Sequence, residues 1–192
     1  MIKDFDLLQR ANNDYTTIDL EHAEELAYRE LIDSIRYIPL GDECGVMGNI
    51  ANIITYKGRF YIQEEQFDRV FIYDDTGRCL KKIDNKGRGP GEYLRIESID
   101  INTEKEELML VDGMSDKLFF YDLDGNFKSI HSIRYFQTEN TLCLRDSVFL
   151  HISAPSQNFG NEGLYGYALV LSKGNENFLK GYRYLPLQVG YK

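Results

Sequence analysis

An internal repeat constrains the fold of this chain more than any other feature of the sequence. The segment 60–77 reads FYIQEEQFDRVFIYDDTG, and the segment 108–125 reads LMLVDGMSDKLFFYDLDG. They align without a gap, 48 positions apart, a period typical of repeat architectures. The identical pairs are Asp68/Asp116, Phe71/Phe119, Tyr73/Tyr121, Asp74/Asp122 and Gly77/Gly125. The repeat indicates an architecture, but it leaves the activity open because one fold can serve many functions.

Each copy is predicted to form four short antiparallel strands. Runs rich in Val, Ile, Phe and Tyr are separated by turns that contain Gly, a pattern typical of strands joined by hairpins. In the run 69–74, Val70 and Ile72 fall on one face, and Phe71 and Tyr73 on the other. A third, degenerate copy follows the second. The predicted strands are 50–56, 60–64, 69–74, 78–83, 96–102, 108–112, 117–122, 127–133, 141–144, 147–153, 167–172 and 178–184.

Four antiparallel strands in a repeat of roughly 45 residues are typical of a propeller blade. We therefore expect an all-β fold, a partial β-propeller built of four-stranded antiparallel blades. About three blades are expected within residues 41–192, at 50–83, 95–134 and 140–185, the last with a long loop at 154–166. Residues 1–40 are expected to hold a strand at 15–20, a short helix at 21–33 and an orphan strand at 34–40. In a closed propeller, that orphan would be the outer strand that closes the ring.

The bulk composition excludes some classes of partner. The chain has 192 residues and a formal net charge of −9, so it repels phosphate backbones and we expect no nucleic-acid partner. No run approaches the ~18 apolar residues of a membrane span. The first residues, MIKDFDLLQRANND, contain no apolar leader, so the sequence as given predicts a cytoplasmic protein, unless it is the mature part of a secreted one.

The cysteines and histidines give no sign of a metal or cofactor site. Cys44, Cys79 and Cys143 are odd in number and widely spaced, so we expect three small apolar residues rather than a disulfide framework. The three histidines show no zinc-binding spacing. The segment 122–133 is not an EF-hand loop, because it lacks the glycine and the final carboxylate that such a loop needs. We therefore expect no cofactor and no metal.

Three motifs carry a resemblance to a known family. SIRYIPL at 34–40, GRGPGEY at 87–93 and the YD-x-x-G that ends the third strand of the first two blades resemble the six-bladed, NHL-like β-propeller proteins abundant in gut anaerobic bacteria. The resemblance implies six blades, a chain about twice this length, and a periplasmic or cell-surface location behind a secretion or lipoprotein leader. Because only three blades are predicted here, we expect the ring to be completed by further blades of a longer chain or by a second copy of this one.

Seven residues are candidate ligand-binding residues, all expected at one end of the blades. They are Arg88, Glu92 and Tyr93 of the crossover motif, and Asp68, Arg69, Asp112 and Asp116 of the loops between second and third strands. A structural role is the alternative for each: the crossover residues would tie adjacent blades together, and the recurring Asp would bond its own loop. Phosphate binding by GRGPGEY is disfavoured because a strand, not a helix, follows the glycines.

The sequence favours a non-enzymatic binding or scaffold domain. It contains no nucleophile elbow or other catalytic signature, and the expected ligand is a carbohydrate, a peptide or a second protein. Two alternatives remain. One is a hydrolase or lyase with a site at the mouth of the propeller channel, and the other is a structural fragment with no site of its own.

Overall fold

The computed structural model describes residues 32–133, 140–145, 147–152, 167–174 and 177–183. In these residues the chain forms three sheets of four antiparallel strands each, and no helix. Every sheet is a simple meander in which consecutive strands pair. The strands of the first sheet are β1 (Ile50–Tyr56), β2 (Arg59–Glu64), β3 (Arg69–Asp74) and β4 (Cys79–Ile83); of the second, β5 (Ser98–Asn102), β6 (Glu107–Asp112), β7 (Lys117–Asp122) and β8 (Phe127–Ser132); of the third, β9 (Asn140–Cys143), β10 (Val148–Ile152), β11 (Tyr167–Lys173) and β12 (Asn177–Arg183).

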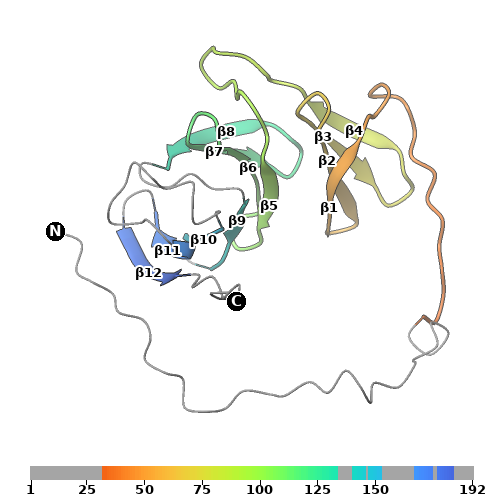
Figure 1. The fold of residues 1–192 in the computed structure, drawn as a ribbon. Coiled ribbons are helices and arrows are strands. Elements are labelled where there is room, and N and C mark those ends of the chain that lie inside the picture. Colours follow the sequence, from red (N-terminus) through yellow and green to blue (C-terminus); the bar gives the residue numbers. More distant parts are fainter. Residues whose placement is uncertain (1–31, 134–139, 146, 153–166, 175–176, 184–192) are drawn as a thin grey trace, which may run out of the picture.

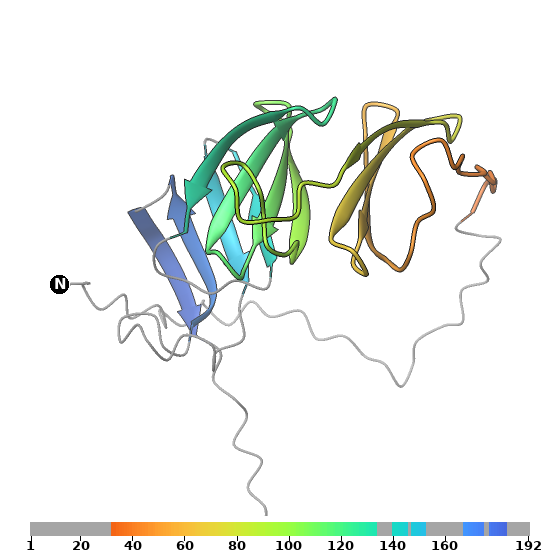
Figure 2. The ribbon, with the colours of Figure 1, turned by 90° about the horizontal axis from the view of Figure 1, so that it is seen from above.

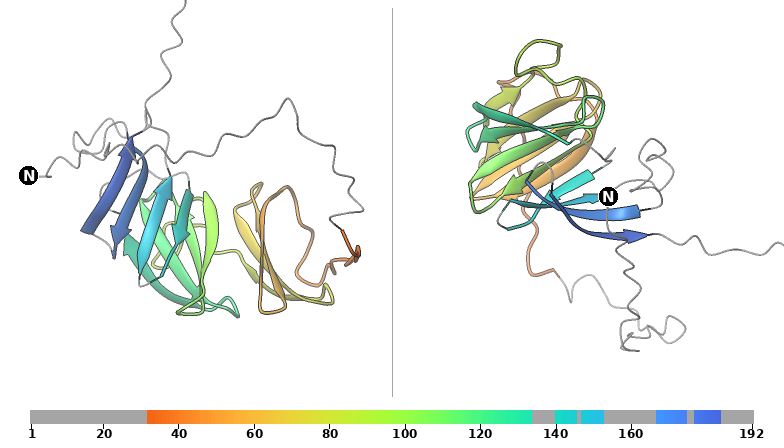
Figure 3. Two further views of the ribbon diagram at one scale, coloured as in Figure 1. Left: turned by 90° about the horizontal axis from the view of Figure 1, so that it is seen from below. Right: turned by 90° about the vertical axis from the view of Figure 1, so that its left-hand side faces the viewer.

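The three sheets follow one another side by side along an arc (Figures 1 and 2). Their first strands, β1, β5 and β9, approach one another and form the inner edge of the arc. The twist of successive sheets is visible from two further sides in Figure 3. Sheets that repeat radially, with their first strands meeting at the centre, make the fold β-propeller-like.

The predicted strands agree with the structure to within two residues at each end. The largest difference is at β5, which begins at Ser98 instead of 96. The predicted strand at 15–20 and nearly all of the helix at 21–33 lie outside the described residues, as does the long loop at 154–166. Residues 34–40 belong to no strand of the described structure, and the side chains of Ile35 and Tyr37 are 68% and 88% exposed.

The repeated YD-x-x-G motif builds the turn after the third strand. The Asp74 carboxylate accepts hydrogen bonds from the backbone N–H groups of Thr76 (3.0 Å) and Arg78 (3.1 Å), and Asp122 does the same in the second sheet. A hydrogen bond from the Thr76 hydroxyl, together with those from the two backbone N–H groups, holds the pKa of Asp74 near 2, below its usual value. Gly77 has a φ of +89°, which favours glycine.

Alternation along the strands gives each sheet two apolar faces. We call the face toward the preceding sheet the near face and the other the far face. The far face of the first sheet (Tyr61, Val70, Ile72) packs on the near face of the second (Leu110, Phe119, Tyr121) in one buried cluster. The far face of the second (Met109, Leu118, Phe120) packs on Phe149 and Val170 of the third. We call these two packed interfaces the first and second seams.

The near face of the first sheet is covered by residues 41–49, which we call the cover segment. Ile62, Phe71 and Tyr73 are at most 2% exposed, and Cys44 and Met47 of the cover segment pack against them. A disulfide joins Cys44 to Cys79 of β4, with a Cα–Cα distance of 5.9 Å. The expectation of unpaired cysteines is therefore wrong for this pair, because tertiary packing of the cover segment, and not sequence spacing, brings them together. Cys143 is free.

Candidate functional site

A polar cleft opens where the first and second sheets meet, beside the starts of β1 and β5. Its volume is about 360 Å³. It collects residues from three connections: the segment before β1, the loop after β2, and the end of the crossover that leads into β5. We call it the seam cleft. Its lining residues are Asn49, Ala51, Gln63, Glu65, Gln66, Asp68, Arg95, Ile96 and Glu97.

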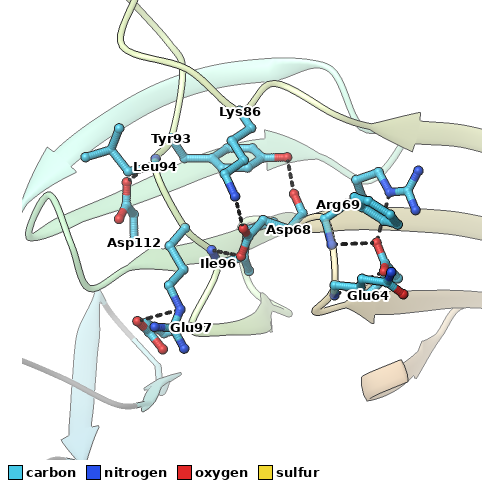
Figure 4. Close-up of polar contacts among 12 residues, drawn as sticks. Glu64, Asp68, Arg69, Lys86, Tyr93, Leu94, Ile96, Glu97 and Asp112 are labelled. Carbon is cyan, nitrogen blue, oxygen red and sulfur yellow. Dashed lines mark hydrogen bonds and ion pairs between the residues drawn. The ribbon is translucent and has the colours of Figure 1, made fainter. Parts of the chain in front are cut away.

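Two buried side chains hold the floor of the seam cleft in place. The Gln63 side chain donates from Nε2 to the backbone oxygens of Ile96 (3.1 Å) and Glu97 (3.3 Å). The Asp68 carboxylate accepts the Ile96 N–H at 3.1 Å and a bond from the Lys86 ammonium (Figure 4). Both side chains belong to the first sheet and reach backbone of the crossover, so they fix the position of the crossover against that sheet.

The rim of the seam cleft is exposed and rich in hydrogen-bonding groups. Asn49, Glu65 and Gln66 are exposed, and the Arg95 side chain is 57% exposed. Arg95 pairs with Glu97, a partly buried residue, at 3.2 Å, and the solvent around Arg95 weakens this pair. Among the lining residues, three carry a carboxylate and one carries a cation, and none is Ser, Cys or His. The lining therefore suits hydrogen bonding to a neutral or cationic group, and it holds no candidate nucleophile of the usual kinds.

Tyr93 is buried inside the first seam. It is fully buried, and its ring packs edge-on against Phe119 at 6.0 Å between centroids. Its hydroxyl donates to the Asp68 backbone oxygen (2.8 Å) and accepts the Asn85 N–H (3.2 Å). Burial raises the pKa of Tyr93 well above the usual tyrosine value. Tyr93 thus anchors the crossover in the core, between the first two sheets.

The other two crossover candidates are exposed. The Glu92 carboxylate accepts the Gly89 N–H at 2.7 Å and folds back over its own loop. Glu92 also lines a separate shallow hollow of about 340 Å³, with Phe127 at the start of the outer strand β8. Arg88 is exposed on the same loop. Neither residue lines the seam cleft.

Asp112 and Glu64 occupy equivalent positions at the ends of β6 and β2, and both cap their own loops. Asp112 is 1% exposed and accepts the N–H groups of Met114 (3.0 Å) and Ser115 (3.1 Å), as well as the Leu94 N–H of the crossover (2.7 Å). Glu64 is fully buried and binds Arg69, whose Nε lies 2.9 Å from its carboxylate. The Arg69 guanidinium is therefore held by a carboxylate of its own sheet.

Asp68 and Asp116 share a backbone conformation. Their φ angles are +57° and +53°, a region that Asp tolerates better than most residues. Asp116 is exposed, and its pKa is raised by partial burial and by the nearby Asp112. The recurrence of this Asp thus follows from a turn requirement, whereas the contacts of its carboxylate differ between the two sheets.

Sequence reasoning therefore located one member of the seam cleft, Asp68, among its seven candidates. It missed Asn49, Gln66, Arg95 and Glu97, whose residue types differ between the first two copies of the repeat. One signal could have found them: the residues just before each first strand and those just after each second strand meet at the same end of a meander.

The described residues contain neither a cluster of metal ligands nor a membrane-spanning helix. No group of three or more His, Cys, Asp or Glu side chains in that part of the chain could hold a metal ion. No helix there is long and apolar enough to cross a membrane.

Comparison with known proteins gives a family and a fold. The model of a family described as a domain of unknown function (DUF4934) matches residues 15–185. The crystal structure of a predicted exported protein from Bacteroides fragilis superposes with a TM-score of 0.69 at 19% identity, covering 82% of this chain and 44% of that one. A structure of U3-55K gives 0.51 at 10% identity, covering 71% of this chain and 40% of that one. The chain thus spans less than half the length of either, and no curated protein matches it.

Proposed function

The chain belongs to the DUF4934 family, a domain of unknown function, and we propose that it is a non-enzymatic binding domain whose seam cleft holds a polar ligand. The observation that carries this proposal is the cleft itself. It combines a floor fixed by buried Gln63 and Asp68 with an exposed rim of amide, carboxylate and guanidinium groups. Polar groups that converge on a fixed floor can orient a small ligand through hydrogen bonds.

The charge of the cleft narrows the class of ligand. Glu65, Asp68 and Glu97 outnumber Arg95, so an anionic ligand such as a phosphate would be repelled. A neutral carbohydrate or a peptide with a basic side chain would meet acceptors from the carboxylates and both donors and acceptors from the amides. The alternative of a hydrolase or lyase is less well supported, because the best-buried carboxylate of the cleft, Asp68, already binds Lys86 and the Ile96 N–H.

A scaffold role in a larger ring is the second part of the proposal. The segment 34–40 would be the outer strand of a sheet that precedes the first. The position of this segment supports the assignment. A Cβ added at Gly77, in the turn of the first sheet, would meet Ile38 and Pro39. A Cβ added at Gly125, in the equivalent turn of the second sheet, would meet Lys81 and Ile83 of β4. The segment 34–40 thus lies against the first sheet much as β4 lies against the second. Six blades of NHL type, from more chain or a second copy, would complete such a ring.

The disulfide favours one of the two cellular locations that the sequence suggests. Disulfides such as Cys44–Cys79 persist in oxidising surroundings and are rare in the bacterial cytosol. This favours the periplasmic or cell-surface location implied by the family resemblance over the cytoplasmic one.

Titration of the protein with two panels tests the binding proposal, one of neutral oligosaccharides and one of short peptides that carry Lys. We expect Gln66→Ala and Arg95→Ala to weaken binding of any ligand found by about tenfold each. The matched control is Arg78→Ala, which removes an exposed arginine that pairs with Asp74 away from the cleft. Calorimetry measures the affinities. Binding that neither cleft variant changes would place the ligand elsewhere and end the proposal.

A further inference from the structure

We propose that the Cys44–Cys79 disulfide locks the cover segment over a sheet-docking face, and that its reduction opens this face to the third sheet of a second copy of the chain. The inference rests on the scaffold part of the proposed function and is independent of the seam cleft. Its elements are the near face of the first sheet, the cover segment and the far face of the third sheet.

The near face of the first sheet is built like one that docks a sheet. Its apolar residues Ile62, Phe71 and Tyr73 occupy the repeat positions of Leu110, Phe119 and Tyr121. Two of these three pairs are identical. In the second sheet, these positions are buried against the far face of the first sheet. The same side chains in the same register are therefore suited to pack against another sheet in the first.

The cover segment takes the place of that sheet. Phe71 and Tyr73 are 0% and 1% exposed beneath it, so no other sheet can contact them unless the segment moves. Hydrogen bonds hold both of its ends: the Gly41 N–H donates to the Gly77 oxygen (2.8 Å), and the Glu65 N–H donates to the Asn49 oxygen (3.0 Å). Such bonds exchange with water at little net cost. The disulfide joins the middle of the cover segment to β4 by a covalent bond, which water cannot replace.

The disulfide can be reached by a reductant. Cys44 is partly exposed, whereas Cys79 is 9% exposed. A thiolate of a dithiol reductant attacks the Cys44 sulfur, the S–S bond breaks, and Cys79 leaves as a thiolate that takes up a proton. The second thiol of the reductant then resolves the mixed disulfide. Two electrons pass to the protein, which gains two thiols, and the dithiol becomes a cyclic disulfide.

The far face of the third sheet is the matching surface. Leu142, Leu150 and Leu171 lie directly opposite one another across β9, β10 and β11, on the side away from Phe149 and Val170. Leu142 is 37% exposed. Within the molecule, the far face of each sheet packs on the near face of the next, at both seams. A second copy that presents the far face of its third sheet to the first sheet would continue the same series, with its β12 replacing the segment 34–40 beside Gly77. Two such contacts would close a ring of two chains.

Sedimentation of the chain in its oxidised form, after reduction with dithiothreitol, and as the variant Cys44→Ser/Cys79→Ser tests this inference. We expect a one-chain mass for the oxidised protein and a two-chain mass for the other two at the same concentration. Adding Leu142→Arg to the double variant should restore the one-chain mass. Adding Met114→Arg instead, at a 65% exposed loop residue away from both faces, should leave the two-chain mass unchanged.

Hydrogen exchange of the reduced wild-type protein gives a second measurement that does not depend on any variant. The Cys79 N–H, which donates to the Glu43 carboxylate of the cover segment, should exchange at least tenfold faster after reduction. Unchanged exchange, a one-chain mass after reduction, or aggregation without a two-chain species would each overturn the inference. A two-chain mass already present in the oxidised protein would also overturn the lock, while leaving the proposed ring partner standing.

Discussion

The two seams of this molecule use the same repeated positions, but the polar contacts of their described residues differ. At the first seam, the crossover enters the interface: Tyr93 is buried in it, and Gln63 and Asp68 bind its backbone. At the second seam, whose crossover at 134–139 lies outside the described residues, the polar contacts come from the inner strands and the turns beside them. The Thr141 N–H reaches Ser98 Oγ at 3.4 Å, and the Lys105 ammonium reaches Ser147 Oγ at 2.9 Å.

The two seams should therefore respond differently to pH and to substitution. The first has a large apolar cluster and polar groups that bind backbone. The second has a smaller apolar cluster beside a buried histidine, His151, which lies between the hydroxyls of Thr141 (3.0 Å) and Ser172 (2.8 Å). Burial lowers the pKa of His151 to about 4. The first seam should thus depend on packing and on its crossover, and the second on the protonation state of one side chain.

Removing a ring from the first seam has the largest expected effect. Phe119→Ala, at a fully buried position, should lower the free energy of unfolding by about 3–5 kcal/mol, because it leaves a cavity in the larger cluster. Phe149→Ala in the second seam should lie at the lower end of that range, since its cluster is smaller. Urea denaturation of both variants measures the two losses. A greater loss for Phe149→Ala would reverse the ranking of the seams.

The second-largest effect is expected from acid, which should weaken the second seam. Folding favours neutral His151, so its contribution is fully present above the unfolded pKa of about 6.5 and is lost as the pH falls toward 4. The loss is up to about 3 kcal/mol. Burial raises the pKa of Asp100, which acts in the opposite direction and offsets part of it.

The control for the acid effect is His151→Gln, which retains a donor and an acceptor but does not titrate. Amide exchange in β10 and β11 should accelerate between pH 7 and pH 4.5 in the wild-type protein and much less in the variant. Equal acceleration in both proteins would show that another group senses the acid.

The paired aspartates offer a finer test. Asp68→Ala and Asp116→Ala both remove an Asp from a positive-φ position, so they share that backbone cost. In the part of the chain that the structure describes, the Asp68 carboxylate, unlike that of Asp116, accepts an N–H from across the seam and pairs with a lysine, Lys86. Asp68→Ala should therefore cost about 1–3 kcal/mol more. Thermal unfolding measures the difference, and equal losses would mean that the turn alone explains the repeat of this residue.

The smallest effect is expected at the surface of the first seam. Arg59 pairs with Asp124 at 2.7 Å, and the Asp124 side chain is 68% exposed. Asp124→Asn should cost less than about 1 kcal/mol, because solvent screens the pair and Arg59 keeps its bond to the Leu123 oxygen. A loss as large as that of Asp68→Ala would show that surface charge, and not the crossover, holds this seam.

Local pattern was enough to predict the strands and their faces. Alternation separates Val70 and Ile72 from Phe71 and Tyr73, and the structure buries the two pairs in different clusters. The Asp74 and Asp122 turns were likewise predictable, since each is a contact within a few residues of chain.

The seam cleft and the disulfide depend on contacts that no local pattern encodes. Gln63 and Ile96 are 33 residues apart, and Cys44 and Cys79 are 35 apart. Each pair meets only after whole sheets or the cover segment have packed. The crossover motif at 87–93 was singled out for its glycines and charges, but its most consequential residue, Tyr93, acts through burial.

The span of the disulfide has a consequence for the order of folding. Both cysteines and every member of the near-face cluster lie between residues 44 and 79, in the cover segment and in the first of the three sheets to be synthesised. Closing a loop of this length removes about 4 kcal/mol of chain entropy from the unfolded state. The first sheet can therefore be covalently complete before the later sheets pack against it, and it can serve as the template on which they assemble in turn.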